Sequence, residues 1–244
     1  DVMAQVFMIA SGKGGTGKST VAAYISLEMA LSGKKTLLIE LDAGLRSIDV
    51  ITGVEGKTVY DIGDVLQGRC DAEKAWVQSP NSNNLFIIAA PYKNTNDDFS
   101  GFGKLVNSFV DQYDCIVIDT AAGFPKAFYR AAKTADTGIV VTTPDVVSVR
   151  DAKLTCDEMY AGGVRTVRLI INKFSRENFA YSGFENVDKI IDFIGARLLG
   201  IVPFSGAIAQ CGANGSPLDG QSKEKSIFNA ICQRIFGKDI QIII

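Results

Sequence analysis

The stretch Gly12-Lys13-Gly14-Gly15-Thr16-Gly17-Lys18-Ser19 decides how the rest of the chain is interpreted. A glycine, four further residues and then Gly-Lys-Ser is the spacing of a P-loop, a backbone cradle for a polyphosphate. Glycines are needed there because the backbone curves closely around the phosphates with its N–H groups inward. An apolar run at 6–10 precedes the loop and a helical pattern at 21–30 follows it. This order of strand, loop and helix favours a P-loop over a structural glycine-rich turn.

The loop residues predict particular contacts with a bound nucleotide. We expect Lys18 to bridge the β- and γ-phosphates and the Ser19 hydroxyl to ligate Mg²⁺. A helix that starts near Gly17 would direct its positive dipole end at the phosphates. The residues expected to bind ATP or ADP in this stretch are Gly12, Gly14, Gly15, Thr16, Gly17, Lys18, Ser19 and Thr20.

The composition excludes several classes of protein. The 244 residues are 47% hydrophobic and 21% charged, which is enough for a well-buried core. Since 25 basic residues stand against 27 acidic ones, no basic surplus favours a nucleic-acid partner. Histidine is absent, and none of the five cysteines forms a CxxC pair, so the sequence indicates no His or zinc site. Without a signal peptide or an apolar run of about 18 residues, we expect a cytoplasmic chain that does not span a membrane.

Two further apolar runs end in acidic residues. The run at 36–41 carries Glu40 and is followed by Asp42, and the run at 114–119 ends in Asp119. Strands of an open α/β sheet deliver such residues to the ligand crevice. We expect Asp119 to hold the Mg²⁺ shell, and Asp42 to orient water or simply to cap a helix. The small residues at 120–123 predict a switch segment beside the γ-phosphate.

A second lysine within the loop, Lys13, is not needed by an ordinary P-loop. With it, residues 13–19 resemble the deviant Walker A motif of the MinD/ParA family of ATPases. The segments Gly44-Leu45-Arg46 and 148–151 (Ser-Val-Arg-Asp) resemble the MinD branch of that family. The resemblance implies a homodimer in the ATP state, in which Lys13 reaches the partner's nucleotide and Asp42 activates water.

The same resemblance implies further contacts. It places an adenine-reading residue at Asn172, which a turn asparagine would also explain, and a base-side residue at Pro203. It places a regulatory protein partner near Arg150 and Asp151, where the start of a helix is the plainer interpretation.

The chain also departs from the family pattern. Glu40 stands where the family has aspartate, so we assign it no role, and Phe204 replaces an acid that follows Pro203. Two alanines replace a proline in the expected switch segment at 120–123. The tail at 237–244 shows no basic amphipathic segment, so peripheral contact with the inner face of the cell membrane is left open.

Alternating strands and helices predict one α/β domain over residues 1–244, a P-loop NTPase with a mostly parallel twisted sheet and helices on both faces. An apolar face on the last helix, around Ile227, fits the core or a membrane or partner surface. The expected strands lie at 6–10, 36–41, 85–90, 114–119, 137–142, 166–172 and 198–203, and the expected helices at 21–30, 59–66, 72–77, 104–112 and 223–236.

These expectations lead to one preferred function and three alternatives. The preferred function is a Mg-dependent ATPase that acts as a spatial switch in division-site placement. A DNA-partitioning ATPase of the ParA type would need a basic surface. A MinD-like flagellar-number regulator usually carries an N-terminal extension, and a metal-cluster ATPase would need paired cysteines.

Overall fold

The computed structural model describes residues 3–44, 46–92 and 99–242. Within these ranges the chain forms an eight-stranded sheet with the order β3-β4-β2-β5-β1-β6-β7-β8. Every neighbouring pair is parallel except β3 with β4, which confirms the predicted fold class. The strands are β1 (Gln5–Ala10), β2 (Thr36–Glu40), β3 (Trp76–Gln78), β4 (Leu85–Ile88), β5 (Cys115–Asp119), β6 (Thr137–Thr142), β7 (Thr166–Phe174) and β8 (Arg197–Pro203).

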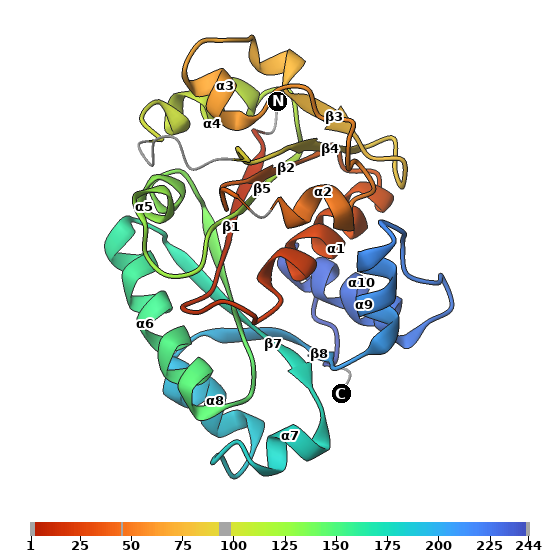
Figure 1. Cartoon of the computed structure of the whole chain (residues 1–244). Helices are drawn as coiled ribbons and strands as arrows, with labels where there is room; N and C mark the ends of the chain where they lie inside the picture. The colour runs from red at the N-terminus through yellow and green to blue at the C-terminus, as the bar shows by residue number, and fades with distance from the viewer. Residues whose placement is uncertain (1–2, 45, 93–98, 243–244) are drawn as a thin grey trace.

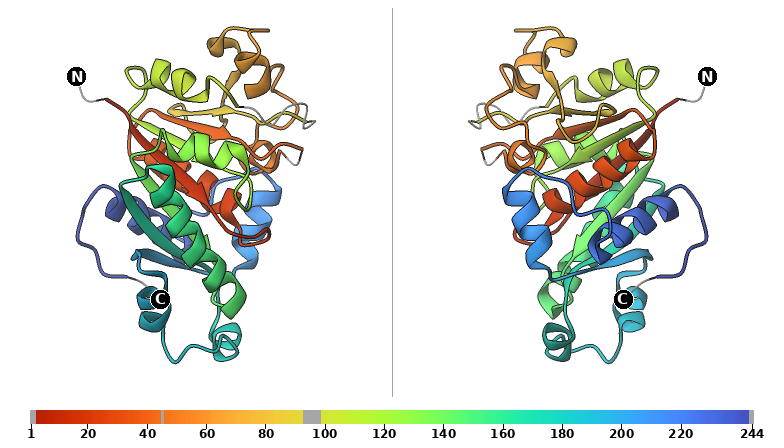
Figure 2. Two further views of the ribbon diagram at one scale, coloured as in Figure 1. Left: turned by 90° about the vertical axis from the view of Figure 1, so that its left-hand side faces the viewer. Right: turned by 90° about the vertical axis from the view of Figure 1, so that its right-hand side faces the viewer.

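Helices cover both faces of the sheet (Figures 1 and 2). One face packs against α1 (Lys18–Leu31), α2 (Ser47–Ile51), α9 (Gly206–Ala213) and α10 (Lys223–Ile235). The opposite face packs against α3 (Ile62–Leu66), α4 (Phe102–Phe109), α5 (Lys126–Ala132), α6 (Val146–Gly162) and α8 (Val187–Ile194). The short helix α7 (Arg176–Ala180) follows β7 and has no buried residue.

The apolar runs of the sequence become strands because both of their faces are covered. Every residue of β2 and β5 is buried, as expected for parallel strands between two helix layers. The final helix settles its open assignment, since Ile227, Phe228 and Ile231 are at most 3% exposed within the core. That face is therefore core, and it is not a membrane or partner surface.

Two predictions about the segment after β2 are wrong. Residues 72–77 were expected to be helical, but they form a single 3₁₀ turn at Ala72–Lys74, and the chain then enters β3. The Trp76 ring packs edge-on against Phe86 of β4, with centroids 4.9 Å apart, so tertiary pairing outweighs local helix propensity. The predicted helix over 59–66 begins only at Ile62, and Val59 is 83% exposed.

The late start of α3 has a local cause. Asp61 and Asp64 form a capping box, in which each carboxylate accepts a hydrogen bond from the backbone N–H of the other residue, at 3.1 and 3.0 Å. This reciprocal cap fixes the first turn after Asp61 and leaves residues 59 and 60 outside it. The polar sequence at 91–103, rich in Gly, Asn and Asp, predicts an exposed loop, but residues 93–98 lie outside the described residues, as does Leu45 of the Gly-Leu-Arg segment.

The order of the strands creates a crevice beside β1. β1 leads to β2 on one side of it, whereas its neighbour β6 leads to β7 on the other side, so the connections leave these two adjacent strands in opposite directions. Ligands of open α/β sheets bind at such a switch point, beyond the carboxyl ends of the strands. The P-loop follows β1 directly and therefore lies at this point. In the part of the chain that is described, no helix combines the length and apolarity needed to cross a bilayer.

Candidate functional site: the P-loop crevice

The P-loop joins β1 to α1, and its backbone takes a conformation that requires glycine. Gly15 and Gly17 both have φ of 83°, in the left-handed region. At Gly17 a Cβ atom would also lie 2.3 Å from Nδ2 of Asn172, so no larger residue fits. The loop thus forms the close, curved backbone that the motif predicts.

The end of β7 holds the loop in this shape. Asn172 is buried, and its Nδ2 donates to the carbonyl oxygen of Thr16 at 2.8 Å. Lys173, which has a positive φ of 54°, donates from Nζ to the carbonyl oxygen of Gly15 at 2.7 Å. Sequence reasoning gave Lys173 no role. Its only signal was its position next to Asn172 at the end of an apolar strand.

Lys18 and Asp119 form a buried ion pair at the base of the crevice. Lys18 Nζ lies 2.7 Å from Asp119 Oδ1, and the side chains are 6% and 0% exposed. Lys18 Nζ also donates to the Ser19 hydroxyl at 3.2 Å. The second carboxylate oxygen of Asp119 is buried and has no hydrogen-bond partner. The structure therefore brings together the three residues that the sequence assigned to phosphate and metal binding.

Lys13 turns toward its own chain. Its Nζ lies 3.3 Å from Oδ1 of Asp145, with the two side chains 37% and 49% exposed. Asp145 caps α6 by accepting from the Ser148 backbone N–H, and its other oxygen accepts from the hydroxyls of Thr143 and Ser148, both at 2.6 Å. Burial alone would raise the pKa of Asp145, but these hydrogen bonds hold that pKa well below its usual range. Asp145 is therefore an ionised partner for Lys13, a role that its position as a helix cap concealed in the sequence.

Two more acidic residues, Glu40 and Asp42, lie at the carboxyl end of β2, near Lys18 and Asp119. Asp42 is half-buried, and burial raises its pKa, with the Lys18 charge opposing and the Asp119 charge adding to the rise. Glu40 is fully buried and lies in register with Asp119 on the neighbouring strand. Burial, reinforced by the Asp119 charge, raises the pKa of Glu40 to about 8. Glu40 accepts hydrogen bonds from the backbone N–H groups of Ile48 at 3.3 Å and Ala90 at 3.5 Å, so it joins β2 to α2 and to the residues after β4.

The expected switch segment at 120–123 is attached to the strand and loop of the site. The Thr120 hydroxyl donates to the carbonyl oxygen of Ile9 at 3.1 Å, and the Gly123 N–H donates to that of Ser11 at 3.1 Å. The Thr120 N–H also donates to the Ile9 carbonyl oxygen, at 3.2 Å, so three hydrogen bonds join this segment to β1 and to the residue before the P-loop.

The start of α6 also touches the P-loop. A Cβ atom at Gly12 would lie 2.6 Å from Cβ of Asp151, so the loop and the helix are in direct contact there. Arg150, one position earlier, is exposed. The two residues that the sequence linked to a partner are thus a solvent-facing arginine and a half-buried aspartate beside the nucleotide loop.

The remaining predicted residues lie at the rim. Thr20 is half-buried in the first turn of α1 and lines a hollow of about 440 Å³ with residues of α2 and α9. Pro203 ends β8 and is half-buried, while Phe204 is 72% exposed. Phe204 lines a shallow cavity of about 270 Å³ that Lys173 and Asp145 also line. An aromatic side chain therefore lies where the family pattern has an acid.

The residues fit a magnesium nucleotide. Buried Thr16 Oγ1 and Asp119 Oδ2 lack partners, beside a lysine and a backbone cradle suited to phosphate. Mg²⁺ keeps most of its waters and takes only one or two protein ligands along with phosphate oxygens, which suits Ser19 and Asp119. Among the described residues no cluster of three His, Cys, Asp or Glu side chains could hold a metal ion.

Comparison with known proteins agrees with this geometry. Residues 7–218 match the family model described as CbiA, the CobQ/CobB/MinD/ParA nucleotide binding domain. The septum site-determining protein MinD of Synechocystis sp. is 32% identical over 246 residues, which cover 99% of this chain and 92% of that protein. The structure of the MinC:MinD cell division complex of Aquifex aeolicus superposes with a TM-score of 0.88 at 33% identity, covering 98% of both chains. A MinD from Pyrococcus horikoshii, solved with Mg-ADP, shares the fold with a TM-score of 0.84 at 24% identity.

Proposed function

The chain belongs to the CobQ/CobB/MinD/ParA nucleotide binding domain family, and from this premise we propose that it is a MinD-type, Mg-dependent ATPase. It dimerises on ATP and acts as a spatial switch in division-site placement. The family consists of P-loop ATPases, and the relatives found are septum site-determining proteins, so the partitioning alternative has less support. The eight-stranded sheet draws strands from Gln5 to Pro203, which supports our proposal that residues 1–244 form one domain. We propose that this domain acts in the cytoplasm.

The observation that carries the proposal is the position of two lysines in one loop. Lys18 is buried against Asp119, where it is positioned for the phosphates of its own nucleotide. Lys13 is half-exposed at the mouth of the crevice, and among the described residues its ammonium group pairs with Asp145 alone. A lysine on a flexible stem at the rim can leave such a pair and reach a second subunit. In the dimer we assign Lys13 to the partner's phosphates.

The acidic residues divide the remaining tasks. Ser19 and Asp119 would hold Mg²⁺, which when bound neutralises phosphate charge. Asp42, half-buried beside this pair with a raised pKa, would orient the attacking water. Asn172 and Pro203 would border the base, with Asn172 keeping its hydrogen bond to the loop.

Partner recognition would use the exposed start of α6. The Aquifex relative was solved in a complex with MinC, so we propose a regulatory protein of that kind for this chain. Arg150 is exposed and Asp151 touches the P-loop at Gly12, so a partner bound to α6 would act on the loop directly. Peripheral membrane contact remains a proposal that liposome co-sedimentation with ATP and with ADP would test.

The experiment that tests the function is ATP-dependent dimerisation of wild type and of Lys13→Ala. We expect sedimentation velocity to show dimers of wild type with MgATP and monomers with MgADP. Lys13→Ala should bind ATP but remain monomeric and hydrolyse slowly, while Lys104→Ala, an exposed lysine on α4, should behave as wild type. Dimerisation and turnover of Lys13→Ala at the wild-type level would refute the assignment of Lys13 to the partner's phosphates.

A further inference from the structure

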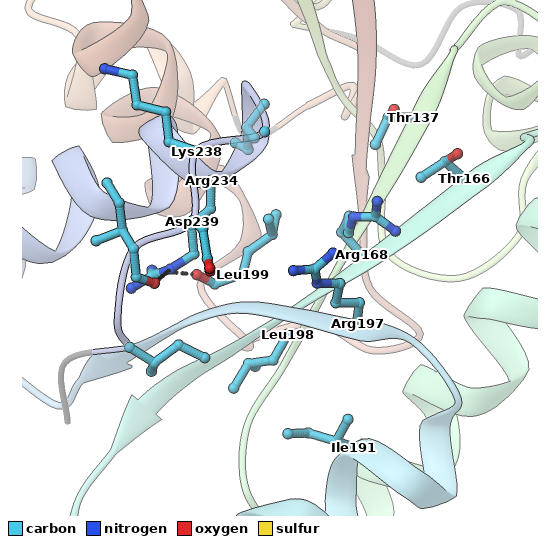
Figure 3. Close-up of a pocket in the computed structure, with 14 residues that line it drawn as sticks. Thr137, Thr166, Arg168, Ile191, Arg197, Leu198, Leu199, Arg234, Lys238 and Asp239 are labelled. Atoms are coloured by element: carbon cyan, nitrogen blue, oxygen red, sulfur yellow. Dashed lines mark hydrogen bonds between the residues drawn. The ribbon is translucent and has the colours of Figure 1, made fainter.

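Two arginines face each other across neighbouring strands at the edge of the sheet away from the P-loop. Arg168 of β7 and Arg197 of β8 are aligned Cα partners in the parallel ladder. Figure 3 shows their side chains lying next to each other above the two strands. Like charges placed directly opposite on one face of a sheet repel each other. This arrangement therefore needs an explanation that packing alone does not supply.

No acidic side chain neutralises the pair within the described ranges. Arg168 donates one long hydrogen bond, 3.4 Å, to the carbonyl oxygen of Val167, and neither arginine forms an ion pair with a described residue. Among the described residues that line the same cavity, Lys238 and Arg234 are basic, and Asp239 alone is acidic. Positive charge thus exceeds negative charge around the pair.

The arginines line a cavity of about 540 Å³. Thr137 and Thr166, which are themselves aligned partners on β6 and β7, bring two hydroxyl groups to its wall. The segment after α10 closes one side, and Ile240 and Ile242 line the cavity from that segment. The lining therefore combines guanidinium groups, hydroxyl groups and an apolar wall.

Arg234 fixes the closing segment. Its guanidinium donates to the carbonyl oxygen of Leu199 at 2.6 Å (Figure 3). It also donates to the carbonyl oxygens of Ile240, at 2.8 Å, and Gln241. Because these bonds occupy Arg234 with backbone oxygens, Arg168 and Arg197 are the guanidinium groups left for a ligand. The segment after α10 is therefore fixed by hydrogen bonds as one wall of the cavity, and Arg168 and Arg197 place positive charge on the lining.

We propose that this cavity binds a phosphate group carried by a small organic molecule or a lipid headgroup. Guanidinium groups match phosphate oxygens in paired hydrogen bonds, and a dianion placed between two of them removes their mutual repulsion. The threonine hydroxyls complete the donor set, and the apolar wall leaves room for the group that carries the phosphate. The site lies where β6, β7 and β8 begin, whereas the P-loop lies beyond the end of β1, so the two are separate.

The test measures phosphate binding with the P-loop already filled. Thermal unfolding is followed in saturating MgADP while inorganic phosphate replaces chloride at constant ionic strength. We expect a saturable rise in Tm for wild type that is lost in Arg168→Gln/Arg197→Gln and kept in Arg165→Gln, a nearby exposed arginine. An unchanged rise in the double variant would overturn the proposal. Failure of the ATPase proposal would leave this result unaffected, since no hydrolysis is measured.

The single substitution Arg197→Gln should change Tm in opposite directions, relative to wild type, without and with phosphate. Without phosphate, Arg197→Gln relieves the repulsion and should raise Tm by about 1–3 °C. With saturating phosphate the order reverses, because wild type gains stability and the variant does not. A lower Tm for Arg197→Gln in both conditions would show that the arginine is merely structural and would overturn the proposal.

The source of the phosphate is separated by co-sedimentation with phosphatidylcholine vesicles, with and without phosphatidic acid. Pelleting that depends on phosphatidic acid and is lost in Arg168→Gln/Arg197→Gln, but not in Arg165→Gln, identifies a lipid headgroup. A phosphate-dependent Tm shift without arginine-dependent pelleting identifies a soluble phosphorylated compound. Absence of both effects contradicts the site.

Discussion

Lys18 Nζ lies 2.7 Å from Asp119 Oδ1, and both side chains are almost completely withdrawn from water. Lys18, which we expect to bind phosphate, and Asp119, which we expect to hold Mg²⁺, therefore neutralise each other's charge. A magnesium nucleotide would offer each of them a new partner of the correct charge. Neither charge is buried alone, so removing either partner would leave an uncompensated buried charge.

This relationship predicts the effect of Asp119→Asn. Removing the carboxylate leaves the Lys18 charge buried without a counter-charge, so the nucleotide-free protein should lose about 3 kcal/mol of unfolding free energy. Urea denaturation measures the loss, and the exposed Asp111→Asn serves as control. ATP hydrolysis should disappear as well. Wild-type stability of Asp119→Asn would show that the pair is energetically unimportant.

The second prediction concerns the pair formed by Lys13 and Asp145. Asp145→Asn removes the charge that holds Lys13, but asparagine still caps a helix well, so α6 should remain intact. Both side chains are partly exposed, so the pair is worth at most about 1 kcal/mol, and ATP-dependent dimerisation should strengthen by up to about fivefold.

Sedimentation velocity over a range of protein concentrations checks this change in dimerisation. Asp157→Asn is a suitable control, since Asp157 forms an exposed ion pair with Lys153 on the same helix. Weaker dimerisation of Asp145→Asn would mean that Asp145 supports the dimer and does not compete with it.

Much of the fold followed from local sequence because its signals are local. The spacing of glycines and lysines in residues 12–19 specifies the P-loop by itself, and buried apolar runs specify the central strands. The strand β3 was missed because Ala72, Glu73 and Lys74 favour a helix, whereas Trp76 forms a strand only through its pairing with β4. That pairing joins segments whose proximity depends on the whole sheet.

The sequence predicted individual residues of the site, but it did not predict the contacts between them. The acid at the end of β5 was predicted at Asp119, but its contact with Lys18 depends on the register between β1 and β5. Asp145 is the N-cap of α6, a role that its residue type explains by itself, so nothing in the sequence demanded its second role with Lys13. Lys173 carries no motif, and only the three-dimensional path of β7 brings it to Gly15.

The third prediction separates two roles of Asn172. Its Nδ2 is committed to the Thr16 carbonyl oxygen, whereas its Oδ1 has no such commitment and can accept from the adenine amino group. We expect Asn172→Ala to lower the binding affinity for both ATP and GTP by about tenfold, because a buried hydrogen bond that shapes the loop is lost. The loss should be larger for ATP.

Isothermal titration with the two nucleotides measures both effects, and Asn107→Ala, exposed on α4, is the control. Equal weakening of ATP and GTP would limit Asn172 to holding the loop. Unchanged binding of both would contradict both roles.

The last prediction uses the buried carboxyl of Glu40. Its pKa is about 8 in the folded chain against an ordinary value of 4.5, so the folded state keeps a proton that the unfolded state has released. Unfolding free energy should therefore fall as pH rises from about 4.5 to about 8, by roughly 1.4 kcal/mol per pH unit at most, and then level off. Glu40→Gln has no such group to titrate and can still accept one backbone hydrogen bond. Urea denaturation from pH 5 to 9 measures the unfolding free energies of wild type and Glu40→Gln. The wild type should lose stability relative to the variant as the pH rises to about 8. A difference that stays constant over this range would show that Glu40 is ionised in the folded protein, and that a charge other than Lys18 compensates for two buried carboxylates.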